Sequence, residues 1–187
     1  MQYTTHYESP MGGILLAADD IGLTGLWFDK AKYYAADLDP YHEEKELPVF
    51  EDVKRYLTIY FSGREPDFMP PLHVTGSPFR VAVWEILRTI PYGKTMTYGE
   101  IAKLMAKRRG LSSMSAQAVG GAVGHNKISI IIPCHRVVGA KGSLTGYAGG
   151  IDRKVKLLNL EKADMRQLFI PQKGTALRAD GNAAQSR

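Results

Sequence analysis

The most informative stretch of the sequence is SAQAVGGAVGHNKISIIIPCHRVV, from Ser115 to Val138. It starts with a serine that can cap a helix, continues with a helix of small residues over 116–124, and then contains the only cysteine, Cys134. The three glycines of this helix each cost about 1 kcal/mol relative to alanine. So costly a composition indicates close approach to another surface, either a neighbouring element of the protein or a nucleic-acid groove.

Two further helices are expected before this one. Apolar residues at helical spacing predict a helix over 79–87. Thr97-Tyr98-Gly99-Glu100 has the form of a capping box, so a second helix is expected to begin there and to end at 107–110. Three short helices with a turn before the last are typical of a helix-turn-helix, whose final helix normally enters DNA.

Cys134 lies between the run Ile130-Ile131-Ile132 and the basic pair His135-Arg136. A cysteine reacts as its thiolate, and an adjacent imidazole and guanidinium would lower its pKa from about 8.5. The alternative is a buried cysteine that packs as a small hydrophobic residue, which the isoleucines would suit. These residues alone leave both interpretations open.

The first part of the chain has the pattern of a small sheet. Runs over 3–8, 13–18 and 23–28 are separated by turns, which predicts an antiparallel meander. From Pro48 the spacing of apolar residues becomes helical, and this spacing places on one side of a helix Phe50, Val53, Leu57 and Tyr60. We expect this helix to cover one face of the sheet.

These patterns predict an α/β (α+β) protein with an N-terminal domain over 1–72 and a helical domain over 77–170. The tail over 171–187 is polar and small, and we expect it to be disordered. Residues 1–72 hold 6 Lys/Arg against 13 Asp/Glu, whereas residues 73–187 hold 18 against 6. The basic half suits a polyanion such as nucleic acid, although many basic proteins bind none.

Several classes of protein are not expected. No apolar run approaches the length of a membrane span, and the N-terminus lacks the pattern of a secretory signal. One cysteine cannot form an internal disulfide, which favours a reducing, cytoplasmic setting. The five histidines have no ligand spacing, so no metal is predicted. The glycine-rich loop over 139–150 lacks the ending of a P-loop.

Four features together resemble the 6-O-alkylguanine-DNA alkyltransferases, also called methylated-DNA–protein-cysteine methyltransferases. They are Pro133-Cys134-His135-Arg136-Val137-Val138, the small-residue helix over 118–122, Asn126, and the loop over 146–150. The resemblance extends from about Ser77 to Glu161, with a looser match over the N-terminal sheet. It implies a ribonuclease H-like N-terminal domain and a C-terminal winged helix-turn-helix.

The resemblance also implies a DNA repair reaction. A monomer without a cofactor would bind double-stranded DNA through the minor groove and flip an alkylated guanine out of the stack. The alkyl group of 6-O-alkylguanine, with 4-O-alkylthymine as a second candidate, would pass irreversibly to the cysteine in a single turnover.

The family pattern implies a role for each site residue. Cys134 is the expected acceptor, His135 a base that acts through a water, Glu161 the residue that orients His135, and Asn126 a brace for the turn before the cysteine. Contacts to the base or alkyl group are expected from Tyr98, Val137, Tyr147, Ala148 and Gly149. Contacts to DNA are expected from Ser115, Gln117, Ala118, Gly121, Ala122 and Arg136, of which Arg136 is also expected to pair inside the protein.

Two features depart from the family pattern. Gln117 stands where many members carry an arginine that fills the gap left by the flipped base, and glutamine brings no charge and a shorter reach. The segment over 107–114 is longer than in compact members, and its Lys107, Arg108 and Arg109 are candidates for phosphate contacts.

Three other functions compete with this one. A lesion-binding relative would recognise alkylguanine without removing the alkyl group, although such proteins typically lack the cysteine. A cysteine hydrolase would need an oxyanion hole and turnover. A plain winged-helix DNA-binding protein would carry an inert cysteine, which thiol reactivity would reveal.

Overall fold

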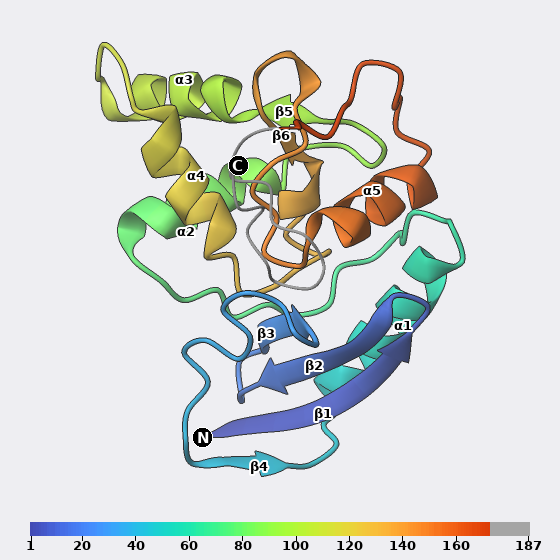
Figure 1. Cartoon of the computed structure of the whole chain (residues 1–187). Helices are drawn as coiled ribbons and strands as arrows, with labels where there is room; N and C mark the ends of the chain where they lie inside the picture. Colours follow the sequence, from blue (N-terminus) through green and yellow to red (C-terminus); the bar gives the residue numbers. More distant parts are fainter. Residues whose placement is uncertain (173–187) are drawn as a thin grey trace.

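The computed structural model describes residues 1–172 and consists of a four-stranded sheet with one helix, packed against a group of four helices (Figure 1). From residue 173 onward, the tail that we expect to be disordered lies outside the described residues. The expected fold class, an α/β protein with a small antiparallel sheet followed by a helical part, is confirmed.

The predicted meander forms strands β1 (Gln2–Ser9), β2 (Gly12–Ala18) and β3 (Leu23–Phe28), paired antiparallel. A short fourth strand, β4 (His42–Glu44), pairs parallel to β1 and completes the order β3-β2-β1-β4. The sequence did not predict β4 because all three of its residues are exposed, so no alternation of apolar and polar residues marks it.

Helix α1 (Pro48–Phe61) covers one face of this sheet (Figure 1). Its buried side consists of Phe50, Val53, Tyr56, Leu57 and Tyr60, which includes the four residues that the helical spacing placed together. Pro48 occupies the first turn, where its missing N–H costs no hydrogen bond. The last residue of the buried side, Tyr60, lies at the end of α1 that faces the C-terminal half.

The C-terminal half contains the three predicted helices, α2 (Pro78–Leu87), α3 (Tyr98–Arg109) and α4 (Ala116–Gly124), and then α5 (Ile151–Leu160). The capping box at the start of α3 is present in both directions. Gly110 ends α3 with φ 64°, and Ser115 caps α4 by accepting from the amide of Ala118. Two short parallel strands, β5 (Met96–Thr97) and β6 (Val137–Val138), join the start of α3 to the cysteine segment.

The two halves share one hydrophobic core. Its largest cluster of buried side chains includes Phe28 and Tyr60 from the first half and Trp84, Ile131 and Tyr147 from the second. Backbone bridges also connect β3 to residues Leu72 and Ile128. The sheet is therefore in direct contact with the segment that leads to Cys134. The division into two domains at 72–77 stays a prediction.

Candidate active site around Cys134

The segment that carries Cys134 is a series of tight turns. Cys134–Arg136 forms one 3-10 turn. Cys134 N–H donates to the carbonyl of Ile132 at 2.8 Å, and Arg136 N–H donates to that of Pro133 at 3.0 Å. Because a 3-10 helix rotates about 120° per residue, adjacent side chains still point in different directions. Among the described contacts, none joins the Cys134 sulfur to the His135 ring.

Asn126 holds this turn in place from the end of α4. Its amide nitrogen donates to the carbonyl of Ile132 at 2.8 Å and to Cys134 Sγ at 3.1 Å. Its Oδ1 accepts from the backbone N–H of Ile128 at 3.0 Å. One buried amide therefore fixes both the backbone before the cysteine and the position of the sulfur.

The Cys134 thiol is a weak acid in this environment. Burial raises its pKa, and the hydrogen bond from Asn126 and the charge of Lys154 oppose the rise only in part. Of the two interpretations that the sequence left open for Cys134, burial rather than the neighbouring cations therefore decides the direction of the pKa shift. The cysteine rests as a thiol at neutral pH and needs a base before it can react.

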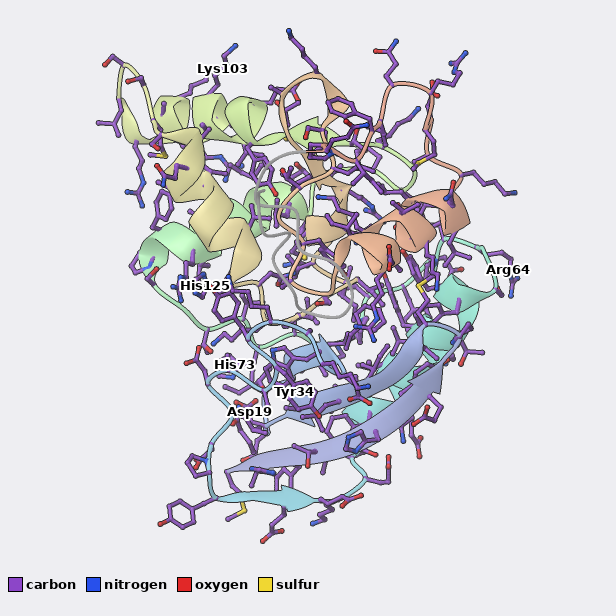
Figure 2. The ribbon with its side chains drawn as sticks, viewed as in Figure 1. Asp19, Tyr34, Arg64, His73, Lys103 and His125 are labelled. Carbon is purple, nitrogen blue, oxygen red and sulfur yellow. The ribbon has the colours of Figure 1, made fainter. Side chains whose placement is uncertain are left out.

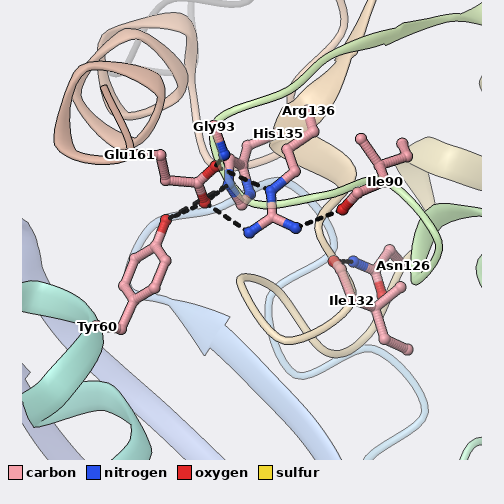
Figure 3. A network of polar contacts seen from close by, with 8 residues as sticks. All are labelled: Tyr60, Ile90, Gly93, Asn126, Ile132, His135, Arg136 and Glu161. Carbon is pink, nitrogen blue, oxygen red and sulfur yellow. Dashed lines mark hydrogen bonds and ion pairs between the residues drawn. The ribbon is translucent and has the colours of Figure 1, made fainter. Parts of the chain in front are cut away.

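Glu161 lies directly after α5 and collects five hydrogen bonds (Figure 3). It accepts from His135 Nε2 at 2.6 Å, from Arg136 Nε and Nη2 at 2.9 Å each, from Tyr60 Oη at 2.8 Å and from Gly93 N–H at 3.1 Å. Burial raises the pKa of this carboxyl, but the hydrogen bonds from His135 and Arg136 and the charge of Arg136 outweigh it and hold the pKa well below its usual range. Glu161 is thus a buried carboxylate.

His135 is fully buried and presents its two ring nitrogens to different surroundings. Nε2 lies 2.6 Å from Glu161 Oε1, so the carboxylate fixes the ring proton on Nε2. Nδ1 has no hydrogen-bond partner among residues 1–172. Burial lowers the pKa of the imidazole, and Glu161 opposes this in part. The ring is therefore neutral at pH 7 with Nδ1 free to accept a proton.

Arg136 pairs inside the protein. Besides Glu161, it donates from Nη1 to the carbonyl of Ile90 at 2.7 Å, and its guanidinium lies 5.7 Å from the ring centre of Tyr92. The internal pairing expected for Arg136 is present. This buried geometry contradicts the other expectation, a DNA contact by the Arg136 side chain, because its charged nitrogens already hold protein acceptors.

Helix α4 has one buried and one exposed side. Val119, Ala122 and Val123 face the core, and Trp84 Nε1 donates to the carbonyl of Ala122 at 2.8 Å. The DNA contact expected of the Ala122 side chain is therefore contradicted, since three-residue spacing from Val119 turns it inward. The other predicted DNA residues of this region are exposed, namely Ser115, Gln117, Ala118 and Gly121.

A groove of about 830 Å³ lies beside the exposed side of α4, and we call it the central groove. Lys32, Tyr98, Gln117, Gly121 and Thr145 are among the residues that line it. Tyr98 Oη donates to the Thr145 carbonyl at 3.3 Å, which ties the start of α3 to the loop after β6.

Among the residues predicted to contact the base, only Tyr98 lines the central groove. Val137 and Tyr147 are buried in the core, and Gly149 is buried with the Tyr147 ring 2.7 Å from where a Cβ would lie. Ala148 is half-buried, and its carbonyl accepts from the Lys32 amide at 2.9 Å. These four residues do not line the central groove, and their contact with a base stays a prediction.

Lys154 is a site residue that the sequence interpretation missed. Its side chain is fully buried in α5, and Nζ donates to the carbonyls of Val137 and Thr145. Burial lowers the pKa of this amine to about 8. A signal was present: Lys154 follows Ile151 by three residues and precedes Leu157 by three, so it falls on the apolar side of the helix.

We expect Lys154→Met to lower the free energy of unfolding by about 2–4 kcal/mol, because it leaves two buried carbonyls without their charged donor. The matched control is Lys156→Met on the exposed side of the same helix, which should stay within about 0.5 kcal/mol of the original chain. Urea denaturation measures both. Equal values for the two variants would contradict a structural role for Lys154.

Within residues 1–172, no three His, Cys, Asp or Glu side chains gather closely enough to bind a metal ion. None of the described helices combines the length and the apolar character needed to cross a membrane.

The fold and the site define a class: a helix-turn-helix protein with a buried cysteine and an adjacent histidine–carboxylate pair. The family model for the DNA-binding domain of 6-O-methylguanine DNA methyltransferase matches residues 78–163, and the model for its ribonuclease-like domain matches residues 2–74. The chain belongs to the 6-O-methylguanine DNA methyltransferase family.

Individual relatives agree with this assignment. The chain is 43% identical over 161 residues to a methylated-DNA–protein-cysteine methyltransferase of Haemophilus influenzae, with 86% of each chain covered. It is 45% identical to a protein of the same name from Methanosarcina acetivorans, over 85% of this chain and 97% of the other. A crystal structure of Mycobacterium tuberculosis OGT in complex with DNA superposes with a TM-score of 0.72 at 41% identity, covering 86% of this chain and 92% of that one.

Proposed function

We propose that this protein repairs DNA by transferring the alkyl group of 6-O-alkylguanine irreversibly to Cys134, with 4-O-alkylthymine as a second candidate substrate. One observation carries the proposal: the buried sulfur, held at 3.1 Å by Asn126, is followed by a neutral histidine whose Nδ1 is free and whose Nε2 is fixed by Glu161. The names of the relatives supply the substrate class.

The chemistry is a single displacement in which atoms and charge balance. The Cys134 proton passes through a water to His135 Nδ1, and Glu161 stabilises the resulting imidazolium. The thiolate attacks the alkyl carbon, so that an S–C bond forms and the C–O bond breaks. The electron pair stays on the guanine oxygen, and the proton held by His135 passes back through water to the base, which restores guanine and neutral His135. The thioether is stable, so each molecule reacts once.

The DNA would lie along the central groove and the exposed side of α4. Cys134 is only 5% exposed, so a base inside a duplex cannot reach the sulfur. Chemistry on such a base requires its extrusion from the stack. Gln117 lies on the groove wall, where it would hydrogen-bond to the partner of the flipped base without adding charge.

The proposal includes the state of the protein. We infer that it acts as a monomer, as the family resemblance implies. We also infer a reducing, cytoplasmic compartment, because the single cysteine must stay a free thiol to react.

The rate of transfer should show a plateau with pH. Burial lowers the pKa of His135 below its ordinary value of about 6.5 and raises that of Cys134 above about 8.5. Between these two pKa values, the Cys134 thiol and the His135 imidazole are both neutral. The small fraction of molecules with the reactive pair, a Cys134 thiolate and a His135 imidazolium, does not change with pH in this range. Single-turnover rates should thus be flat from about pH 6.5 to 8.5 and fall on acidification. A tenfold rise per pH unit across this range would contradict the role of His135.

The product in DNA tests the proposal. A duplex with one 6-O-methylguanine is incubated in excess over the protein, and its nucleosides are then separated and counted. We expect guanine to be restored up to one equivalent per protein molecule and no further. Tight binding with no restored guanine would favour the lesion-binding alternative, and more than one equivalent would indicate turnover; either result would overturn the proposal.

A further inference from the structure

A second groove, of about 650 Å³, lies between α3 and the segment over 111–116, and we call it the α3 groove. Its lining includes Lys103 and Lys107 of α3 and Leu111, Ser112 and Ser113 of the loop that follows. This loop belongs to the segment over 107–114 that the proposed reaction does not use. Figure 2 shows Lys103 on the outer side of α3, pointing away from the body of the protein.

The α3 groove continues the central groove. Both are lined by Gly99, the second residue of α3, and by Ala116, the first residue of α4. A strand that leaves the central groove at this junction would therefore enter the α3 groove. Ser112 and Ser113 are exposed and offer neutral hydrogen-bond donors along that path.

The charges of this region are not equivalent. Lys103 and Lys107 are exposed and four residues apart, so they share one side of α3, and within residues 1–172 neither forms an ion pair. The neighbouring Arg108 lies 4.0 Å from Glu85, and the guanidinium of Arg109 lies 5.1 Å from the ring centre of Phe79. These two arginines are directed to α2, so the lysines are the cations that the groove presents.

We propose that the α3 groove binds the phosphate backbone of DNA that flanks the lesion, through Lys103 and Lys107. Charge complementarity and continuity with the central groove favour this occupant. The inference rests on the proposed function only in taking DNA as the partner. Of the three candidates suggested by the sequence it keeps Lys107, and it replaces Arg108 and Arg109 with Lys103, one helical turn before Lys107.

The test is the salt dependence of binding to an undamaged duplex, which requires no alkyl transfer. Each phosphate neutralised contributes about 0.9 to the slope of log affinity against log salt concentration. Lys103→Gln with Lys107→Gln should therefore reduce the slope by about 2, and each single variant by about 1. The matched control, Arg108→Gln with Arg109→Gln, removes the same charge and should change the slope by less than about 0.5.

Two results would overturn the inference: a slope that is unchanged in the double lysine variant, or equal reductions in both double variants, which would indicate an effect of net charge alone. All four side chains are exposed, so we expect each variant to keep the fold. Thermal unfolding of each variant checks this. Failure of the proposed function would appear separately, as absence of restored guanine with the original chain.

Discussion

Glu161→Gln is expected to lower the free energy of unfolding by about 3–5 kcal/mol, the usual cost of removing one partner from a buried ion pair. The carboxylate is enclosed and accepts from Tyr60, His135, Arg136 and Gly93 (Figure 3). The amide that replaces it leaves the buried Arg136 guanidinium without a counter-charge. Urea denaturation at pH 7 measures the loss.

The pH dependence of this loss follows from the pKa of Glu161, which the network holds well below its usual range. A carboxyl with a depressed pKa contributes stability that is present above its unfolded value of about 4.3 and is lost as the pH falls toward the folded value. The difference between the original chain and Glu161→Gln should therefore shrink below about pH 4. Glu51→Gln, at an exposed position of α1, is the control and should cost less than about 0.5 kcal/mol. A loss below 1 kcal/mol for Glu161→Gln would contradict the role given to the network.

Cys134→Ser is expected to abolish alkyl transfer, with a rate reduced by about ten-thousandfold or more, as removal of a nucleophile does in enzymes. Serine has nearly the same shape, so the hydrogen bond from Asn126 and the packing of the turn should persist. DNA affinity should change by less than about twofold, because Cys134 is buried below the binding surface. Rates are measured in a single turnover with a duplex that carries one 6-O-methylguanine.

The control for this variant is Ser129→Ala, in the same series of turns but outside the polar network around Glu161. It should retain transfer. Transfer by Cys134→Ser at more than a hundredth of the original rate would show that another group accepts the alkyl.

Local sequence patterns predicted most of the fold. The caps at Thr97 and Ser115 and the apolar spacing of α1 depend on residues a few positions apart, so they can be read from the sequence. Strand β4 and the 3-10 turn at Cys134 carry no such pattern, because exposed residues form the first and long-range packing bends the second.

The acid–base part of the site also depends on contacts between residues far apart in the sequence, which local patterns cannot predict. The resemblance to the family pointed to His135 and Glu161, but the hydroxyl of Tyr60 reaches Glu161 across 101 residues of sequence, and no spacing rule connects them. The sequence could not decide between two environments for Cys134: adjacent cations that would lower its pKa, or burial beside the isoleucines, which in the structure raises it. Burial depends on the whole fold, and here the first half supplies part of it.

The most direct test of the central claim is the mass of the peptide that contains Cys134 after the protein reacts with one equivalent of a duplex holding a single 6-O-methylguanine. The structure predicts that this peptide gains one methyl group per protein molecule, on the sulfur, and that every other peptide keeps its mass. A Cys134 peptide of unchanged mass, or a methyl group on another residue, would contradict Cys134 as the acceptor.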